Sequence, residues 1–279
     1  MNNLTPKSPR EAIPLEGTRT SEEASKRELI KKIILKKEFS KLPEKDIILA
    51  FEKFDKDIYS DEEKFKLTRD LLRKVFSAFT SRKILSSRDK NEEWILKKHL
   101  STRERFSYYE KIYNKIFKDF GKNISVIDLG AGVNGFSYNY FKEIGFNVNY
   151  IAVEAVGQLV DLMNKYFTDK KLNAFAIHKS LFEIQELKKI IKKTKKPRII
   201  FLFKTIDSLE MLERDYSKKL ISEIFPLVDE IVLSFPTRSM IKRKKFRVKR
   251  NWIMNFIKEN FNILEDFEIG DERYIIFKK

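Results

Sequence analysis

The segment SVIDLGAGVNGFSYNYF, residues 125–141, holds the residues with the clearest capacity for ligand chemistry. An apolar run ends there at Asp128, and Gly130, Ala131 and Gly132 follow it. Glycines let the backbone turn sharply and come close to a ligand. The helical pattern after the turn would direct its N-terminal amides toward an anionic or polar group. The segment therefore predicts the first strand, tight turn and helix of a nucleotide-binding α/β sheet.

A second apolar run, NVNYIAVE, ends at Glu154, 22 residues after Gly132. A carboxylate at the end of the second strand of such a sheet can accept hydrogen bonds from both hydroxyls of a ribose. The third glycine of the dinucleotide fingerprint is absent at its spacing. This favours S-adenosylmethionine, which has no pyrophosphate, over a dinucleotide. A strand, turn and helix that bind no ligand are the alternative.

The balance of charge points to a polyanionic partner. The chain has 58 Lys and Arg against 41 Asp and Glu, a net charge of +17, which is typical of proteins that bind nucleic acid. Residues 238–250 concentrate basic side chains with no acid among them, and a phosphate backbone would relieve their mutual repulsion. The predicted RNA-binding residues of this run are Lys242, Arg243, Lys244, Lys245, Arg247, Lys249 and Arg250. A solvated basic surface is the alternative.

Composition excludes several kinds of site. The chain has no cysteine, which excludes disulfides, thiolate zinc sites and cysteine nucleophiles. It has only two histidines, so we expect no metal site. No apolar run approaches the roughly 18 residues that a membrane-spanning helix needs. We therefore expect a cytoplasmic protein without a membrane partner, and a monomer by default.

Three regions differ in pattern along the chain. Residues 1–22 are polar and predict a disordered tail. Residues 23–120 carry apolar stripes at helical spacing and predict an all-helical domain, whose lysines suit docking on RNA or a ribosome or, equally, form a solvated helix face. Residues 121–279 alternate strand and helix patterns, which predicts the doubly wound sheet of an α/β fold.

The alternating region resolves into seven predicted strands. They are 124–129, 147–153, 173–178, 198–204, 229–234, 262–267 and 273–278, with helices at 135–144, 157–168, 181–193, 207–222 and 249–260. The last two strands are too close for a crossover helix, so we expect them to form a hairpin. Seven strands that end in an antiparallel hairpin indicate a class I, Rossmann-like methyltransferase domain.

Several motifs resemble one family, the 16S rRNA (guanine-N7) methyltransferases of aminoglycoside resistance. HLSTRERFSYYEKIYNKIF, from residue 99, resembles the STRER segment before that family's catalytic domain. FLFKTIDSLE from 201, VLSFPTRSM from 232 and GDERYIIFKK from 270 are similar to its fourth strand, its SFPxRS loop and its closing strand. The resemblance implies methylation of guanine N7 in the decoding region of 16S rRNA, with S-adenosylmethionine as cofactor and the small ribosomal subunit as partner.

Two departures from the family pattern concern the cofactor site. The family usually has Gly-Cys-Gly-x-Asn-Pro where this chain runs from Gly130 to Gly135, with glycine in place of the proline. It also usually places an acid after the third strand, near the adenine amino group, where this chain has His178, Lys179 and Ser180. A serine hydroxyl binds that group less strongly than a carboxylate does, so we expect weaker cofactor binding.

Site residues follow from the turn and the resemblance together. An arginine of the STRER segment would pair with the methionine carboxylate, Glu154 would hold the ribose, and Ser180 and Leu181 would border the adenine. The predicted cofactor-binding residues are Arg103, Arg105, Asp128, Gly130, Ala131, Gly132, Glu154, Ser180 and Leu181. The predicted catalytic residues are Lys204, Arg238 and Ser239.

Structural alternatives exist for several of these residues. Arg103 and Arg105 would bridge neighbouring helices, and Lys204 would be a buried lysine paired with Glu210 or Asp207. The aromatic residues Phe246 and Trp252 would stack on a base or, at helical spacing, belong to the core.

The chemistry that the motifs leave out is also informative. Guanine N7 has no proton to lose, so its methylation needs alignment and no general base. The sequence after the fourth strand, Phe203 to Ile206, lacks the motif that holds an exocyclic amine. The alternatives are methylation of another RNA or ring nitrogen, such as adenine N1, and a non-catalytic rRNA-binding or assembly factor with the same fold.

Overall fold

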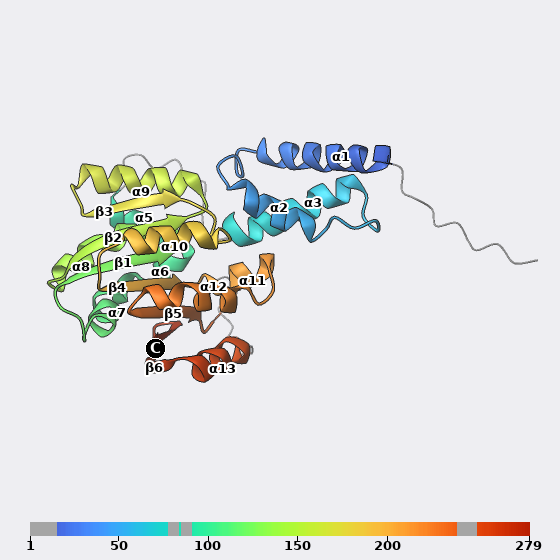
Figure 1. Ribbon diagram of the computed structural model, residues 1–279. Coiled ribbons are helices and arrows are strands. Elements are labelled where there is room, and N and C mark those ends of the chain that lie inside the picture. The colour runs from blue at the N-terminus through green and yellow to red at the C-terminus, as the bar shows by residue number, and fades with distance from the viewer. Residues whose placement is uncertain (1–15, 78–83, 85–90, 239–249) are drawn as a thin grey trace, which may run out of the picture.

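The computed structural model describes residues 16–77, 84, 91–238 and 250–279. Its centre is a seven-stranded sheet in the order β3-β2-β1-β4-β5-β7-β6 (Figure 1). The strands are β1 (Asn123–Leu129), β2 (Asn147–Glu154), β3 (Ala174–His178), β4 (Arg198–Phe203), β5 (Glu230–Pro236), β6 (Asn262–Ile269) and β7 (Glu272–Lys278). The first five are parallel, while β7 runs antiparallel to both β5 and β6. The predicted strands and closing hairpin are confirmed.

Helices cover both faces of the sheet. They are α7 (Tyr109–Ile116), α8 (Tyr138–Glu143), α9 (Gly157–Asp169), α10 (Ile184–Lys193), α11 (Ile206–Leu212), α12 (Tyr216–Ile224) and α13 (Asn251–Asn260). Successive side chains of a strand point to opposite faces. Val126 accordingly joins the core under α7, α8 and α9, whereas its neighbour Ile127 joins the core under α10, α12 and α13. Both faces are therefore buried, as a parallel sheet requires.

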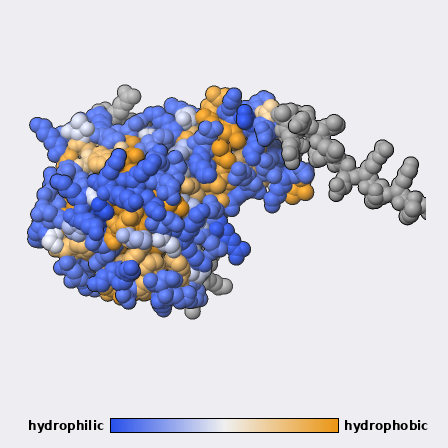
Figure 2. All heavy atoms as spheres, viewed as in Figure 1, coloured by the Kyte–Doolittle hydropathy of each residue, from blue (hydrophilic) through white to orange (hydrophobic). Residues whose placement is uncertain are grey.

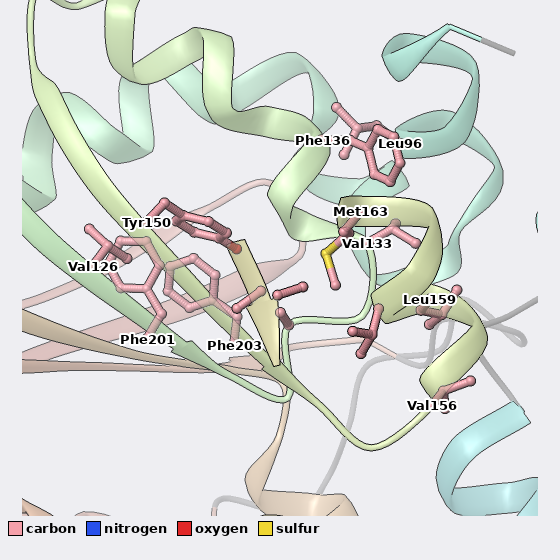
Figure 3. Close-up of a cluster of buried hydrophobic side chains, with 14 of the residues drawn as sticks. Leu96, Val126, Val133, Phe136, Tyr150, Val156, Leu159, Met163, Phe201 and Phe203 are labelled. Atoms are coloured by element: carbon pink, nitrogen blue, oxygen red, sulfur yellow. The ribbon is translucent and has the colours of Figure 1, made fainter. Parts of the chain in front are cut away.

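Aromatic side chains dominate the core on the α7 side. Tyr113 stacks on Phe201, with ring centroids 6.1 Å apart, and Phe201 stacks on Phe203 at 4.4 Å. In Figure 3 the labelled strand residues Tyr150 and Phe201 lie together, and Met163 on α9 lies beside Val133 of the loop after β1. The phenylalanine-rich core thus extends from the sheet to the loop that carries the predicted turn.

The N-terminal region is helical, and in its described residues no strand precedes Asn123. Helices α1 (Glu16–Ile34), α2 (Glu44–Glu52) and α3 (Asp61–Leu72) and the π-helical turn η1 (Arg73–Ser77) form what we call the N-terminal lobe, which lies to one side of the sheet (Figure 1). Helix α1 begins at Glu16, so residues 16–22 are helical and the prediction of a tail over 1–22 is wrong for them; residues 1–15 lie outside the described residues. The apolar stripe that marked this helix begins only at Leu29, because its first turns are polar.

Short helices connect the lobe to the first strand. They are α5 (Glu92–Lys98), α6 (Leu100–Arg105), the 3-10 turn η2 (Phe106–Tyr108) and α7. These elements pack on the sheet and its loops: α5 contacts the 3-10 turn η3 (Asn134–Ser137), and α7 contacts α8. The STRER segment therefore lies next to the sheet in the fold, although in sequence it belongs to the N-terminal helical region.

The prediction of one helix over 207–222 is wrong. The chain breaks into α11 and α12, and Asp215 between them has a positive φ of 60°. The carboxylate of Glu210 accepts hydrogen bonds from the backbone N–H groups of Asp215, at 2.6 Å, and Ser217, at 2.9 Å. These bonds satisfy amide donors at the start of α12, which would otherwise lack partners.

The N-terminal lobe packs closely against α9 and α11, two of the helices that cover the sheet. The backbone N–H of Gly157, at the start of α9, donates to the carbonyl of Lys41 at 3.0 Å, and the Lys41 ammonium pairs with Asp161. A Cβ at Gly157 would lie 2.9 Å from the Cβ of Lys41, so only glycine permits this approach. Helix α11 also contacts α2 and η1. Figure 2 shows hydrophobic side chains at the surface where the N-terminal lobe meets the rest of the molecule.

Candidate functional site

A cavity lies at the carboxyl ends of β1, β2 and β4, the edge at which parallel α/β sheets bind ligands. Its polar lining side chains are Asp46, His99, Ser101, Arg105, Glu154, Lys204, Thr205 and Ser208. The predicted residues that line it are Arg105, Gly130, Ala131, Gly132, Glu154, Leu181 and Lys204. Asp46 on α2 and Phe76 of η1 also line it, so the N-terminal lobe forms part of its wall.

The glycine turn forms the floor of the cavity. Gly130 and Gly132 have φ values of 76° and 57°, a region of backbone conformation that side chains disfavour. A Cβ on Gly130 would lie 2.8 Å from the Cγ2 of Thr205, and one on Gly132 would lie 3.0 Å from the imidazole of His99. The turn is therefore wedged between the ends of β4 and α5, and both glycines are needed for it.

Glu154 lies at the end of β2 beside this turn. Its Oε2 accepts a hydrogen bond from the backbone N–H of Gly132 and its Oε1 accepts one from Val156, both at 2.8 Å. Burial raises the pKa of Glu154, although these backbone donors offset part of the effect. The carboxylate is thus held in the cavity wall by backbone groups, and ribose binding by it stays a prediction.

Asp128 supports the loop after β1. Its Oδ2 accepts hydrogen bonds from the Tyr150 hydroxyl at 2.6 Å and from the Asn134 side-chain amide at 2.8 Å. The Asn134 Oδ1 in turn accepts from Arg105 and from the Tyr109 hydroxyl, each at 2.8 Å. These contacts give Asp128 and Asn134 a positioning role, and a direct cofactor contact of Asp128 stays a prediction.

Arg105 and Lys204 share the buried carboxylate of Glu272, the first residue of β7. The Arg105 Nε and the Lys204 Nζ each lie 3.0 Å from Glu272 Oε2, and Lys204 Nζ lies 2.5 Å from Glu104 Oε2. Burial opposes ionisation of Glu272, but the charges of Arg105 and Lys204 hold its pKa below the ordinary value. We call Arg105, Lys204, Glu104 and Glu272 the ion-pair cluster.

The ion-pair cluster corrects two predictions about partners. Lys204 is buried, but its partners are Glu104 and Glu272; Asp207 pairs with Arg250 instead, and Glu210 caps α12. The backbone at Lys204 has a positive φ of 57°. Arg103 of the same STRER segment is exposed and does not line the cavity, whereas Arg105 is buried and lines it.

His99 lies between the ion-pair cluster and the glycine turn. Burial, with the nearby charges of Arg105 and Lys204, lowers the pKa of His99 to about 3. The imidazole is therefore neutral near pH 7. A Cβ on Gly132 would lie 3.0 Å from this ring, so the imidazole packs directly on the turn.

The wall beyond β3 contains Ser180, Leu181 and Asp46. Leu181 lines the cavity, while Ser180 is fully buried and its hydroxyl donates a hydrogen bond to Asp46 Oδ1 at 2.7 Å. Sequence reasoning did not identify Asp46, Glu104 or Glu272 as site residues. An acid in the first turn of a helix, such as Asp46 in α2, is explained in sequence by the helix dipole alone.

The predicted RNA-binding run is described only at its end. Residues 239–249, which include Ser239, Lys242, Arg243, Lys244, Lys245, Phe246, Arg247 and Lys249, lie outside the described residues. Arg238 is exposed, and its Nε lies 3.2 Å from Asp271 Oδ1. The aromatic ring of Trp252 packs on the core beneath α13, which confirms the core interpretation of that residue.

The structure places Arg250, which the sequence groups with the RNA-binding run, inside the fold. Its guanidinium is buried and bidentate on Asp207, at 3.0 Å and 2.6 Å, and it donates to the carbonyl of Pro236 at 3.1 Å. The backbone at Arg250 has a positive φ of 41°, and the side chain lies over the ring of Phe235. The side chain therefore fixes the start of α13 against α11.

The described residues hold neither a cluster of metal-ligating side chains nor a membrane-spanning helix. Over the described ranges, no three His, Cys, Asp or Glu side chains gather as they would around a metal ion. No helix among those same residues is long and apolar enough to cross a membrane.

Comparisons with known proteins identify the family and relatives of this chain. A family model described as ribosomal RNA methyltransferase (FmrO) matches residues 88–256. The 16S rRNA (guanine(1405)-N(7))-methyltransferase of Proteus mirabilis is 24% identical over 197 residues, which are 66% of this chain and 64% of that protein. The match therefore spans less than two thirds of that relative.

Solved structures share the fold. The 16S rRNA methyltransferase RmtF, crystallised with S-adenosyl-L-homocysteine, superposes with a TM-score of 0.73 at 17% identity, covering 91% of this chain and 98% of that one. An rRNA methylase from Escherichia coli gives a TM-score of 0.70 at 18% identity, covering 91% and 99%. The coverage of both structures includes most of the N-terminal lobe as well as the sheet.

Proposed function

Because this chain belongs to the FmrO family of ribosomal RNA methyltransferases, we propose that it methylates N7 of a guanine in the decoding region of 16S rRNA, with S-adenosylmethionine as methyl donor. The observation that carries the proposal is the cavity in which the glycine turn, Glu154 and Arg105 meet. The related protein of Proteus mirabilis, by its name, modifies N7 of a guanine in 16S rRNA.

The residues around the cavity fit this cofactor. Glu154 presents a buried carboxylate where the ribose hydroxyls would lie, and the turn presents backbone to the rest of the nucleoside. Arg105 is the cation of the STRER segment that reaches the cavity, so it is our candidate partner for the methionine carboxylate. The bound cofactor would supply an activated methyl group on a sulfonium. The chain's own residues have to bind and align the two reactants.

The ionisable side chains of the cavity suit a reaction without proton transfer. Guanine N7 attacks through a lone pair and has no proton to lose. His99 is neutral at pH 7 and packed on Gly132, and the Lys204 ammonium is held by Glu104 and Glu272. We therefore assign Lys204 a positioning role, in which it links the end of β4 to α6, the helix that holds the STRER segment. Arg238 and Ser239 remain our candidates for contact with the target nucleotide.

The partner that we propose is the small ribosomal subunit in the cytoplasm, bound by a monomer of this chain. The N-terminal lobe and the basic run 242–249 would contact the rRNA backbone, which contributes affinity rather than choice of base. A net charge of +17 supports a large polyanionic partner over a small-molecule substrate.

The test is methyl transfer from radiolabelled S-adenosylmethionine to purified small subunits, followed by reduction and aniline cleavage at 7-methylguanine. We expect one cleavage in the decoding region. Incorporation without cleavage would leave a methyltransferase but move the target to another atom, such as adenine N1, or another RNA.

A second measurement distinguishes an enzyme from a binding factor with the same fold. Cofactor affinity measured by calorimetry should fall by about 1–3 kcal/mol in Glu154→Ala if both ribose hydrogen bonds are lost. Glu186, which is partly exposed and pairs with Lys189, provides the matched control Glu186→Ala. Subunit binding without methyl incorporation, together with equal cofactor affinity in both variants, would support the binding factor.

A further inference from the structure

Asp46 is a buried acid that the N-terminal lobe contributes to the cavity. It lies on α2, the residue is 1% exposed, and it lines the cavity together with Glu154 and Leu181. Its Oδ1 accepts the hydrogen bond from Ser180. Its Oδ2 is also buried but has no hydrogen-bond partner among the residues that the structure describes. A buried carboxylate oxygen without a donor is costly, so its position requires an explanation.

The surroundings of Asp46 disfavour its charge. Burial and the nearby carboxylates of Glu154 and Glu183 raise its pKa, while Ser180 and Lys45 act in the opposite direction. No ion pair joins Asp46 to a cation within the described ranges. Helix α2 gains from an acid in its first turn, but an exposed acid would give the same benefit. The helix alone therefore does not explain why this carboxylate is buried at the cavity.

The order of the strands indicates which part of a cofactor would meet Asp46. The glycine turn follows β1, Glu154 ends β2, and Ser180 follows β3, at the outer edge of the sheet. If Glu154 holds the ribose and the methionine extends toward β4 and Arg105, the base has to extend toward β3. Ser180 and Asp46 lie on that side, joined by their hydrogen bond.

We infer that Asp46 Oδ2 accepts a hydrogen bond from the exocyclic amino group of the cofactor's adenine, so that the N-terminal lobe completes the cofactor site. This inference rests on the proposed function. The chain has no acid directly after β3, and Asp46 supplies one from another part of the sequence. Ser180 acts behind it: its hydroxyl donates to Asp46 and accepts from the backbone N–H of Phe182 at 3.0 Å, which fixes the carboxylate.

The test compares two ligands that differ at the proposed contact. S-adenosylhomocysteine carries the amino group, whereas S-inosylhomocysteine carries a carbonyl oxygen in its place. Calorimetry with the full-length chain would give both dissociation constants for the wild type, Asp46→Asn and Asp46→Ala. Glu186→Gln is the matched control, because Glu186 does not line the cavity and pairs with Lys189.

We expect the wild type to prefer the adenosyl ligand and the preference to fall by about tenfold or more in Asp46→Asn and Asp46→Ala. The asparagine amide can donate to the inosine oxygen, so Asp46→Asn should show the larger change. A general loss of packing would weaken both ligands equally and leave their ratio unchanged. Asp46→Asn keeps the shape of the side chain, so it carries the test if Asp46→Ala does not fold.

Two results would overturn the inference in different ways. A ratio that is the same in the wild type, Asp46→Asn and Glu186→Gln would remove Asp46 from adenine recognition while leaving the proposed function in place. A wild type that binds neither ligand would remove both the cofactor assignment and the inference about Asp46.

Discussion

Asp46 and Glu154 are two buried carboxylates in one cavity, and they are held differently. Glu154 is bound by backbone N–H groups at both oxygens, whereas Asp46 has one hydrogen bond and a raised pKa. A buried carboxylate that lacks hydrogen-bond donors is energetically unfavourable, and such groups are typical of binding sites, where a bound ligand supplies the missing donor. The native state therefore loses stability at Asp46 that a ligand would restore.

This leads to a prediction about pH. Burial, with Glu154 and Glu183 nearby, raises the pKa of Asp46 from 3.8 to about 7, which corresponds to about 4 kcal/mol. Between these pH values the folded protein holds a proton that the unfolded chain releases, so the free energy of unfolding falls as the pH rises from about 4 to about 7. Asp46→Asn should lose this contribution and exceed the wild type in stability by roughly 2–4 kcal/mol at pH 8.

The measurement is urea unfolding of both proteins at pH 4.5 and pH 8. Glu230, whose pKa burial also raises to about 7, is present in both proteins and cancels in the difference. A difference between Asp46→Asn and wild type that is equal at the two pH values would contradict the prediction.

The same two residues show what sequence could predict of the site. Glu154 was predicted because the turn and the second strand are close in sequence and have a fixed spacing. Asp46 was not, because it meets Ser180 across 134 residues, and that contact depends on how the lobe packs. Arg105 lines the cavity, and its binding of the cofactor stays a prediction; its pairing with Glu272 depends on a strand 167 residues away.

At the scale of elements, the loop after β1 depends on a glycine that the resembled family usually replaces with proline. A Cβ at Gly135 would lie 2.6 Å from the Cζ of Phe167 and 3.0 Å from the Sδ of Met163, both on α9. The aromatic packing of this chain therefore occupies the space that a larger residue would need.

Gly135→Ala should accordingly lower the free energy of unfolding by about 1–3 kcal/mol, because the core would be overpacked. Gly121→Ala is the matched control: nothing lies within 4 Å of a Cβ there, and the change should stay within about 0.5 kcal/mol of wild type. Adding Phe167→Leu to Gly135→Ala should recover part of the loss. Equal stability of the two alanine variants in urea would show that the loop has room.

Sequence predicted the strands well because each is a continuous apolar run between turns. The sequence pattern does not reveal the break between α11 and α12, because the apolar spacing continues across Asp215. The hydrogen bonds that Glu210 accepts at the start of α12 leave no trace in the spacing of apolar residues. Arg250 was grouped with the basic run by proximity in sequence, although Asp207 engages it in the fold.

At the scale of the whole molecule, the excess of positive charge predicts binding that depends on salt. Neutralising Lys244, Lys245 and Arg247 should weaken binding to small subunits and reduce the slope of log affinity against log salt by about 2 to 3, if each contacts a phosphate. Affinity measured at several potassium concentrations would give this slope.

The matched control removes three charges elsewhere, at Lys189, Lys192 and Lys193, which are exposed on α10. Both triple variants have the same net charge. An equal reduction of the slope in the two triple variants would show that binding depends only on total charge and that the basic run does not contact the rRNA phosphates directly.

The ion-pair cluster also has a consequence for the newly made chain. A ribosome synthesises Arg105 and Lys204 well before it reaches Glu272, the carboxylate that both cations share in the fold. Until β7 inserts beside β5, the two cations lack the carboxylate that they share, and Glu104 alone is left to pair with Lys204. Closure of the sheet and completion of the site are thus one event, so a nascent chain has no finished pocket while the ribosome that makes it is still translating the last hairpin.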